Sequence, residues 1–436
     1  MGPAAAKLID RRLHNVPGKL RVAELFFDVP INYSKPTEGT IRLFARSVRR
    51  SSAFPDTDAT EKPLPWLVFL QGGPGFACRP PQETAFVPYV LDKGYQVLLL
   101  DQRGTGLSST ITAQTLALQD NIVRDCEAIR KSLTLDYPEE YQKWSVLGQS
   151  FGGYCATTYL SKFPEGLREV FLTGGLPPLV KGPGPVYQKT YQNVIKRNEA
   201  YYEKFPEDAE RIKKIYQYLQ QNKPRLSSGV LTPERFQQLG ISFGASGGLD
   251  SIHDIVLRIT NDLELFGFLT RPTLSLVESY GECDLVVIYA LLHEAIYCQG
   301  QASRWSADRL RAANPQFRID SSAETEIYFT GEMIYKDMFE SYDELKEMKE
   351  VADILASSED WPDLYDEAQL AKNEIPVYAA TYVDDMYVNF DLATATARKI
   401  KGVKQFITNT MYHGALRERT DEVIRQLFFL KEDSLD

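Results

Sequence analysis

The chain has 436 residues, of which 43% are hydrophobic and 25% charged, so it can bury a large core and is long enough for two domains. Its net charge of −10 and the lack of a basic tract argue against a nucleic-acid partner. No apolar run reaches the roughly 20 residues that a membrane-spanning helix needs, so no membrane partner is expected.

The N-terminal segment has no apolar core typical of a signal peptide. The five cysteines are scattered and show no C-x-x-C spacing, which indicates neither a zinc site nor a disulfide framework. These features predict a cytoplasmic protein with reduced thiols.

The first part of the chain reads as an α/β sheet. Alternating apolar and polar residues between positions 20 and 50 predict antiparallel strands. Two apolar runs, 66–70 and 95–100, each end in a glycine-rich turn, and further runs at 144–147 and 170–172 flank a helix expected over 154–163. Short apolar strands that alternate with helices are typical of a mostly parallel sheet.

Residues 148–152, Gly-Gln-Ser-Phe-Gly, form a G-x-S-x-G motif between the expected strand 144–147 and the helix that follows. A strand that turns sharply into a helix exposes the serine Oγ, and glycines flank it because the turn has no room for Cβ atoms. The motif also occurs by chance in long chains. Its position between a strand and a helix favours a serine hydrolase with Ser150 as the nucleophile.

The pattern changes after about residue 180. A hinge-like stretch, Gly182 to Pro185, precedes a region of helical periodicity that includes 187–222, 283–298 and 342–355. Strand character returns at 375–382 and 403–408, and a last helix is expected over 420–430. The chain is therefore predicted to have an α/β-hydrolase fold split into 1–180 and 370–436, with a helical cap domain, 181–369, inserted in it.

A serine nucleophile needs a base, and in this fold the order along the chain is Ser, then Asp or Glu, then His. Of the four histidines, His14 precedes the core sheet, and His253 and His293 fall in the helical region. His413 follows the last expected strand. A single histidine in a loop is often only a surface residue, but this position predicts that His413 is the catalytic base.

The acid is expected after the strand 377–382, where Asp384 and Asp385 are adjacent. Neighbouring residues at a strand end point in different directions, so only one of them can reach His413. We favour Asp385, with Asp384 as the alternative.

Two glycine-rich loops precede the elbow. Residues 71–75, Gln-Gly-Gly-Pro-Gly, follow the first core strand and are expected to supply an oxyanion donor near Gly73, with the second from the N–H of Phe151. The loop 101–106 could bind phosphate but lacks the Lys-Ser/Thr ending of a P-loop. It is interpreted as a structural turn in which Asp101 and Arg103 bond nearby backbone.

Together, residues 71–75, 101–108 and 148–153 resemble the prolyl aminopeptidase (proline iminopeptidase) branch of the α/β-hydrolases, the S33 peptidase family. That family usually begins the oxyanion motif with His, where this chain has Gln71. The resemblance implies a serine exopeptidase that releases proline from peptides with a free N-terminus, through an acyl-enzyme, without metal or cofactor.

The resemblance also implies carboxylates in the cap that bind the substrate's amino group, and the matching positions are Glu294 and Glu332. Both lie in apolar, aromatic stretches, where a solvated surface is a weak explanation. The alternative is a structural salt bridge with an arginine such as Arg304. Nearby aromatic residues are candidates for a proline pocket, although such residues are often only core: Tyr297, Trp305, Phe329, Tyr335 and Phe339.

Two other functions remain open. An esterase or amidase would use the same triad without recognising an amino terminus. A non-catalytic binding module that kept the fold is disfavoured, because a degenerate fold usually loses one member of the Ser, Asp, His set.

Overall fold

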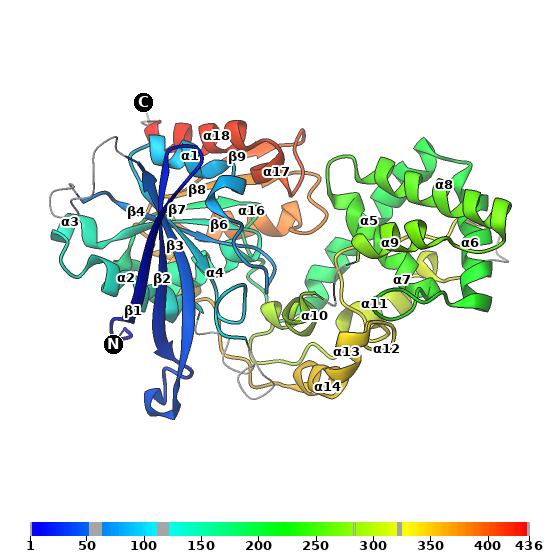
Figure 1. Ribbon diagram of the computed structural model, residues 1–436, viewed down its shortest axis with the longest axis horizontal. Coiled ribbons are helices and arrows are strands. Elements are labelled where there is room, and N and C mark those ends of the chain that lie inside the picture. The colour runs from blue at the N-terminus through cyan, green and yellow to red at the C-terminus, as the bar shows by residue number, and fades with distance from the viewer. Residues whose placement is uncertain are drawn as a thin grey trace. The chain divides into compact units, whose positions relative to one another are not determined.

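The computed structural model describes residues 2–51, 63–110, 122–281, 283, 285–320 and 325–433, and nine strands within them form one sheet (Figure 1). The strands are β1 (Lys7–Val16), β2 (Leu20–Pro30), β3 (Thr40–Arg50), β4 (Trp66–Leu70), β5 (Gln96–Asp101), β6 (Trp144–Gln149), β7 (Leu167–Thr173), β8 (Val377–Tyr382) and β9 (Val403–Thr408). Their order across the sheet is β1-β2-β3-β5-β4-β6-β7-β8-β9.

The sheet begins antiparallel and continues parallel. Strands β1, β2, β3 and β5 pair antiparallel, and all pairs from β5 to β9 are parallel. Every residue of β4, β5, β6 and β8 is buried, as expected for strands covered on both faces. The predicted fold class, an α/β fold with a mostly parallel sheet, is confirmed.

Helices cover both faces of this sheet. They are α1 (Phe86–Asp92), α2 (Ile122–Thr134), α3 (Glu139–Gln142), α4 (Phe151–Lys162), α15 (Glu367–Ala371), α16 (Phe390–Lys399), α17 (Ala415–Glu418) and α18 (Thr420–Glu432). Helices α1 and α18 pack together on one face, and α2 and α4 pack together on the other (Figure 1). In the core under α18, the rings of Phe171 and Phe428 stack at 5.0 Å.

A second group of helices forms a separate unit. They are α5 (Pro183–Lys204), α6 (Asp208–Asn222), α7 (Pro233–Gln237), α8 (Gly248–Phe266), α9 (Arg271–Ser279), α10 (Val287–Leu292), α11 (Ser306–Ala313), α12 (Met338–Ser341), α13 (Asp343–Glu347) and α14 (Lys349–Ser357). In α5 the buried residues Tyr187, Tyr191, Val194, Asn198 and Tyr201 recur every three or four positions, which gives this helix one face toward the unit's interior.

By their contacts, the residues divide into a sheet unit and a helical unit. The sheet unit is Met1–Leu179, Asp363–Val383 and Phe390–Asp436, and the helical unit is Val180–Pro362 and Asp384–Asn389. This division differs from the predicted boundaries mainly in the segment 384–389, which contacts the helical unit. Within the described residues, no helix has the length and apolar character to span a bilayer.

Candidate active site

Ser150 sits at a sharp turn between β6 and α4. Its backbone has φ 54° and ψ −125°, a conformation that few non-glycine residues adopt. The glycines around it have no space for a side chain. A Cβ at Gly152 would lie 1.9 Å from the carbonyl oxygen of Leu70, and one at Gly148 would lie 2.6 Å from that of Gly152. The G-x-S-x-G sequence is therefore a steric requirement of this turn.

The turn after β7 supports the elbow from beneath. The N–H of Ser150 donates to the carbonyl oxygen of Thr173 at 3.1 Å. A Cβ at Gly153 would lie 2.2 Å from the carbonyl oxygen of Gly175, and one at Gly175 would lie 3.0 Å from that of Ser150. The start of α4 thus packs directly on residues 174–175.

His413 approaches the same turn from the loop after β9. A Cβ at Gly174 would lie 3.0 Å from Nδ1 of His413, and Gly174 itself has φ +50°. The imidazole is half-buried, and the adjacent Ala415 and Leu416 are anchored in the core of the sheet unit. Ser150 and His413 therefore both border the turn 174–175, at the carboxyl ends of parallel strands. This is where α/β sheets usually place their active sites.

The two candidate acids differ in their surroundings. Asp384 is exposed, whereas Asp385 is only 1% exposed. Oδ1 of Asp385 accepts hydrogen bonds from the N–H groups of Tyr387 and Val388, at 2.8 and 2.9 Å. These bonds fix the carboxylate in one orientation, which favours Asp385 over Asp384. Both residues belong by their contacts to the helical unit, so the pairing of Asp385 with His413 stays a prediction.

The loop 71–75 passes beside the nucleophile. A Cβ at Gly72 would lie 2.9 Å from Cβ of Ser150, and Gly73 has φ +131°. The side-chain amide of Gln102 donates to the carbonyl oxygen of Gln71 at 3.2 Å and holds the loop. Phe151 is the first residue of α4, so its N–H has no acceptor within the helix. The oxyanion roles of Gly73 and Phe151 stay predictions that suit this arrangement.

The loop 101–106 has the structural role expected of it. Oδ1 and Oδ2 of Asp101 accept from the N–H groups of Cys78 and Leu107, at 2.9 and 3.0 Å. Arg103 donates to the carbonyl oxygen of Ile31 and forms a buried ion pair with Asp125 at 2.6 Å.

In the helical unit, the two predicted carboxylates gather around one tyrosine. Burial raises the pKa of Tyr187, and the negative charges of Glu294 and Glu332 raise it further. The hydroxyl of Tyr187 lies 3.1 Å from Nδ1 of His293, whose Nε2 is 3.9 Å from Oε2 of Glu332. The hydroxyl of Tyr289 donates to Oε1 of Glu332 at 2.9 Å.

Glu294 is 7% exposed, and its two oxygens have different environments. Oε1 accepts from the N–H of Ala307 at 2.9 Å, whereas the buried Oε2 lacks a well-formed hydrogen bond from any described residue. Burial raises the pKa of Glu294, although the nearby Ser303 hydroxyl and the Ala307 amide act in the opposite direction. The alternative of a salt bridge with Arg304 is not what forms, since Arg304 pairs with Glu359 at 2.6 Å.

Three residues near Glu294 and Glu332 were not identified as site residues from the sequence. Tyr187, Tyr289 and His293 come from helices α5 and α10 and the residue after α10, and only the tertiary fold brings them to the glutamates. Among the aromatic candidates, Tyr297 contacts the cluster through an edge-on contact with Tyr187 at 6.1 Å. Phe329 instead packs against Tyr201 and other core rings.

One further group of potential metal ligands lies outside this cluster. Ligand atoms of Glu207, Asp208 and His253 are within 4.8 Å of one another. However, Asp208 already pairs with His253 at 2.8 Å and with Arg211 at 2.9 Å. These protein partners account for the group as a structural ion-pair cluster.

Comparisons with known proteins agree with this geometry. Residues 65–216 match the α/β hydrolase fold family. The chain is 53% identical to proline iminopeptidase aneH of Aspergillus aculeatus, over 99% of this chain and 98% of that protein. It is 39% identical to the proline iminopeptidase of Aeromonas sobria, over 97% of this chain and 99% of that protein. The chain belongs to the proline iminopeptidase family. Membership of this family confirms the resemblance inferred from the three glycine-containing motifs.

Proposed function

We propose that this member of the proline iminopeptidase family is a serine exopeptidase that releases proline from the free N-terminus of peptides. The observation that carries the proposal is the pair of carboxylates, Glu294 and Glu332, gathered in the helical unit. Glu294 keeps a buried oxygen without a well-formed hydrogen bond, and it forms no ion pair with a lysine or arginine among the described residues. A protonated N-terminal amine, which for proline is a secondary ammonium, would supply the missing donor and charge.

The chemistry follows from the residues around the elbow. Oγ of Ser150 attacks the carbonyl carbon of the first residue while His413, oriented by Asp385, takes the hydroxyl proton. The N–H groups of Phe151 and of the loop at Gly73 stabilise the oxyanion. His413 then gives its proton to the leaving nitrogen as the C–N bond breaks, which leaves an acyl-enzyme.

Water completes the cycle. His413 takes a proton from the water as it attacks the acyl-enzyme, and then returns a proton to Oγ of Ser150 as the free amino acid leaves. Glu294 and Glu332 hold the substrate's amino group, which limits cleavage to one residue from the end. No step needs a redox change. The predicted location in the cytosol stays a prediction.

The proposal is tested with L-proline p-nitroanilide, its N-acetylated form and p-nitrophenyl acetate. We expect fast cleavage of the proline amide and none after N-acetylation. Ser150→Ala should lower kcat roughly 10⁴-fold or more for every substrate. Glu294→Gln and Glu332→Gln should each lower kcat/KM for the proline amide on the order of 100-fold and leave the acetate ester unchanged.

Glu278→Gln is the matched control, because Glu278 is in the same unit but is held by the hydroxyl of Ser227 and the N–H of Ser228. It should leave both activities unchanged. If the two glutamate variants kept wild-type proline cleavage, or if acetylation made no difference, the chain would be an esterase or amidase without amino-terminal specificity.

A further inference from the structure

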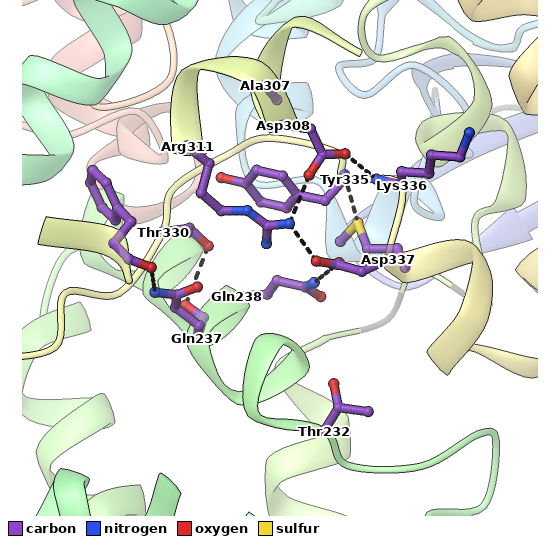
Figure 2. A network of polar contacts seen from close by, with 12 residues as sticks. Thr232, Gln237, Gln238, Ala307, Asp308, Arg311, Thr330, Tyr335, Lys336 and Asp337 are labelled. Carbon is purple, nitrogen blue, oxygen red and sulfur yellow. Dashed lines mark hydrogen bonds and ion pairs between the residues drawn. The ribbon is translucent and has the colours of Figure 1, made fainter. Parts of the chain in front are cut away.

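An ion-pair network of partly buried side chains joins helix α11 to residues 335–337, which follow Glu332 in the chain (Figure 2). The guanidinium of Arg311 bridges Asp308, at 2.7 Å, and Asp337, at 2.5 Å, and it lies 4.0 Å over the ring of Tyr335. The other carboxylate oxygen of Asp308 accepts from the backbone N–H of Lys336 at 2.6 Å. Arg311 and Asp308 thus hold residues 335–337 against α11.

The same helix also holds Glu294. Ala307, in the first turn of α11, donates its N–H to Oε1 of Glu294 at 2.9 Å. Ala307 and Arg311 are four residues apart, about one helical turn. Helix α11 therefore positions Glu294 directly, and it positions the segment that carries Glu332 through Arg311.

A second link ties α11 to the same segment. The hydroxyl of Tyr191 is 2.9 Å from the carbonyl oxygen of Ala307 and 2.9 Å from the hydroxyl of Tyr335. Both tyrosines are buried, so these bonds are shielded from water. Tyr191, a residue of α5, is thus hydrogen-bonded to both Ala307 and Tyr335.

The chain around Glu332 is fastened on its other side as well. The N–H of Thr330 donates to the carbonyl oxygen of Gln237 at 3.0 Å, and the N–H of Phe329 donates to the side chain of Asn198 at 2.7 Å. Glu332 lies between these anchors and the Arg311 network. The short loop of Glu332 is thus held at both ends. At the Arg311 end it is held by α11, the helix that also contacts Glu294.

We propose that Arg311 is a positioning residue that sets the separation of Glu294 and Glu332, and through it the affinity for a free amino terminus. The inference rests on the proposed function. Arginine suits this role because its planar guanidinium bonds both carboxylates through Nη2 while it lies over the ring of Tyr335, a geometry that the compact ammonium of lysine does not reproduce. Nearby negative charge, above all that of Asp337, raises the pKa of Arg311 despite its burial, so the guanidinium stays charged.

The test compares Arg311→Met and Arg311→Lys with the wild type. For L-proline p-nitroanilide we expect KM to rise about tenfold or more in both variants, with kcat changed less than threefold. Hydrolysis of p-nitrophenyl acetate should be unchanged, because that ester has no amino group. Asp337→Asn removes the opposite partner at nearly constant volume and should give the same KM effect if Arg311→Met fails to fold.

Arg211→Met is the matched control. Arg211 also bridges two carboxylates in the helical unit, Asp208 at 2.9 Å and Glu207 at 3.7 Å, but among the described residues it pairs with neither Glu294 nor Glu332. It should lower the Tm much as Arg311→Met does and leave KM unchanged. Equal KM effects at both positions, or no KM effect at Arg311, would overturn the positioning role. Wild-type cleavage that is indifferent to N-acetylation would instead overturn the proposed function.

Discussion

Ionisation of Glu294 costs stability in the folded protein. Because burial raises its pKa above the ordinary value of 4.5, the folded protein holds the proton more tightly than the unfolded chain does. The stability contributed by proton binding is therefore fully present below about pH 4.5 and is lost as pH rises through the folded pKa. Above that pH the folded protein carries a buried charge that lacks a full set of partners.

Glu294→Gln is accordingly expected to stabilise the protein at neutral pH, on the order of 1–3 kcal/mol, while it lowers activity. The gain should shrink as pH falls toward 4.5, because Glu294 in the wild type is protonated to a growing extent. Chemical denaturation at several pH values measures the difference in the free energy of unfolding between variant and wild type.

Glu278 provides a comparison of opposite sign. Its burial acts to raise the pKa, but hydrogen bonds from Ser227 and Ser228 outweigh burial and lower it. Glu278→Gln should thus destabilise the protein at neutral pH.

A stability difference for Glu294→Gln that did not vary with pH would show that the carboxylate of Glu294 does not titrate between pH 4.5 and neutral pH.

The sequence predicts single site residues when the chain order constrains them. His413 is the only histidine after the last expected strand, and the structure places it at the turn that also supports Ser150. Tyr187 and His293 could not be identified in this way. They reach Glu332 through contacts between elements far apart in the chain, and aromatic residues at helical spacing have the same pattern when they are only core.

At the scale of elements, the elbow depends on a close approach of α4 to β4. Gly152→Ala would place a methyl group 1.9 Å from the carbonyl oxygen of Leu70, and a backbone oxygen cannot move aside as a flexible side chain can. We expect a loss of about 3 kcal/mol in the free energy of unfolding and a loss of activity, since Ser150 would shift with the helix. Urea denaturation and proline amide hydrolysis check this.

Gly184→Ala is the control for that substitution. Gly184 lies in the first turn of α5, and apart from its chain neighbours and the helix backbone no described atom is within 4 Å of the position of an added Cβ. The helix propensity of alanine favours the substitution and the ring of the following Pro185 opposes it, so the net change should stay within about 1 kcal/mol of zero. Equal behaviour of the two variants would mean that the approach of α4 to β4 is looser than the structure has it.

There are physical reasons why the sequence patterns fail to predict some elements. Strand β1 is an edge strand in which no residue is buried, so it shows no clear alternation of apolar and polar positions, and it is defined by its pairing with β2. The helix expected over 342–355 is interrupted at Met348, which has φ −100° and ψ 3°, and becomes α13 and α14. A sequence of continuous helical period does not reveal such a break.

At the scale of the whole molecule, two units are built from interleaved parts of the chain. The segment 384–389 follows β8 directly, yet Asn193 donates to the carbonyl oxygen of Asp385 at 3.0 Å and Tyr387 donates to that of Ile241 at 2.6 Å. These contacts assign the segment to the helical unit. The hydrophobic periodicity of the sequence predicts the large inserted region. It does not predict that 384–389 packs with the helical unit, because six residues are too few to show a period.

A chain with two compact units need not unfold in one step, so calorimetry is the measurement that resolves their stabilities. In Ser150→Ala, which binds substrate without cleaving it, we expect a proline-containing dipeptide to raise the Tm. A concentration 100 times Kd corresponds to about 2.7 kcal/mol of stabilisation. The affected transition should be the one that Arg211→Met lowers, because Glu294 and Glu332 lie in the helical unit.

The N-acetylated dipeptide should give no shift, and neither should the free dipeptide with the double variant Ser150→Ala, Glu294→Gln. A shift by the acetylated dipeptide as large as that by the free one would mean that binding does not depend on the amino terminus.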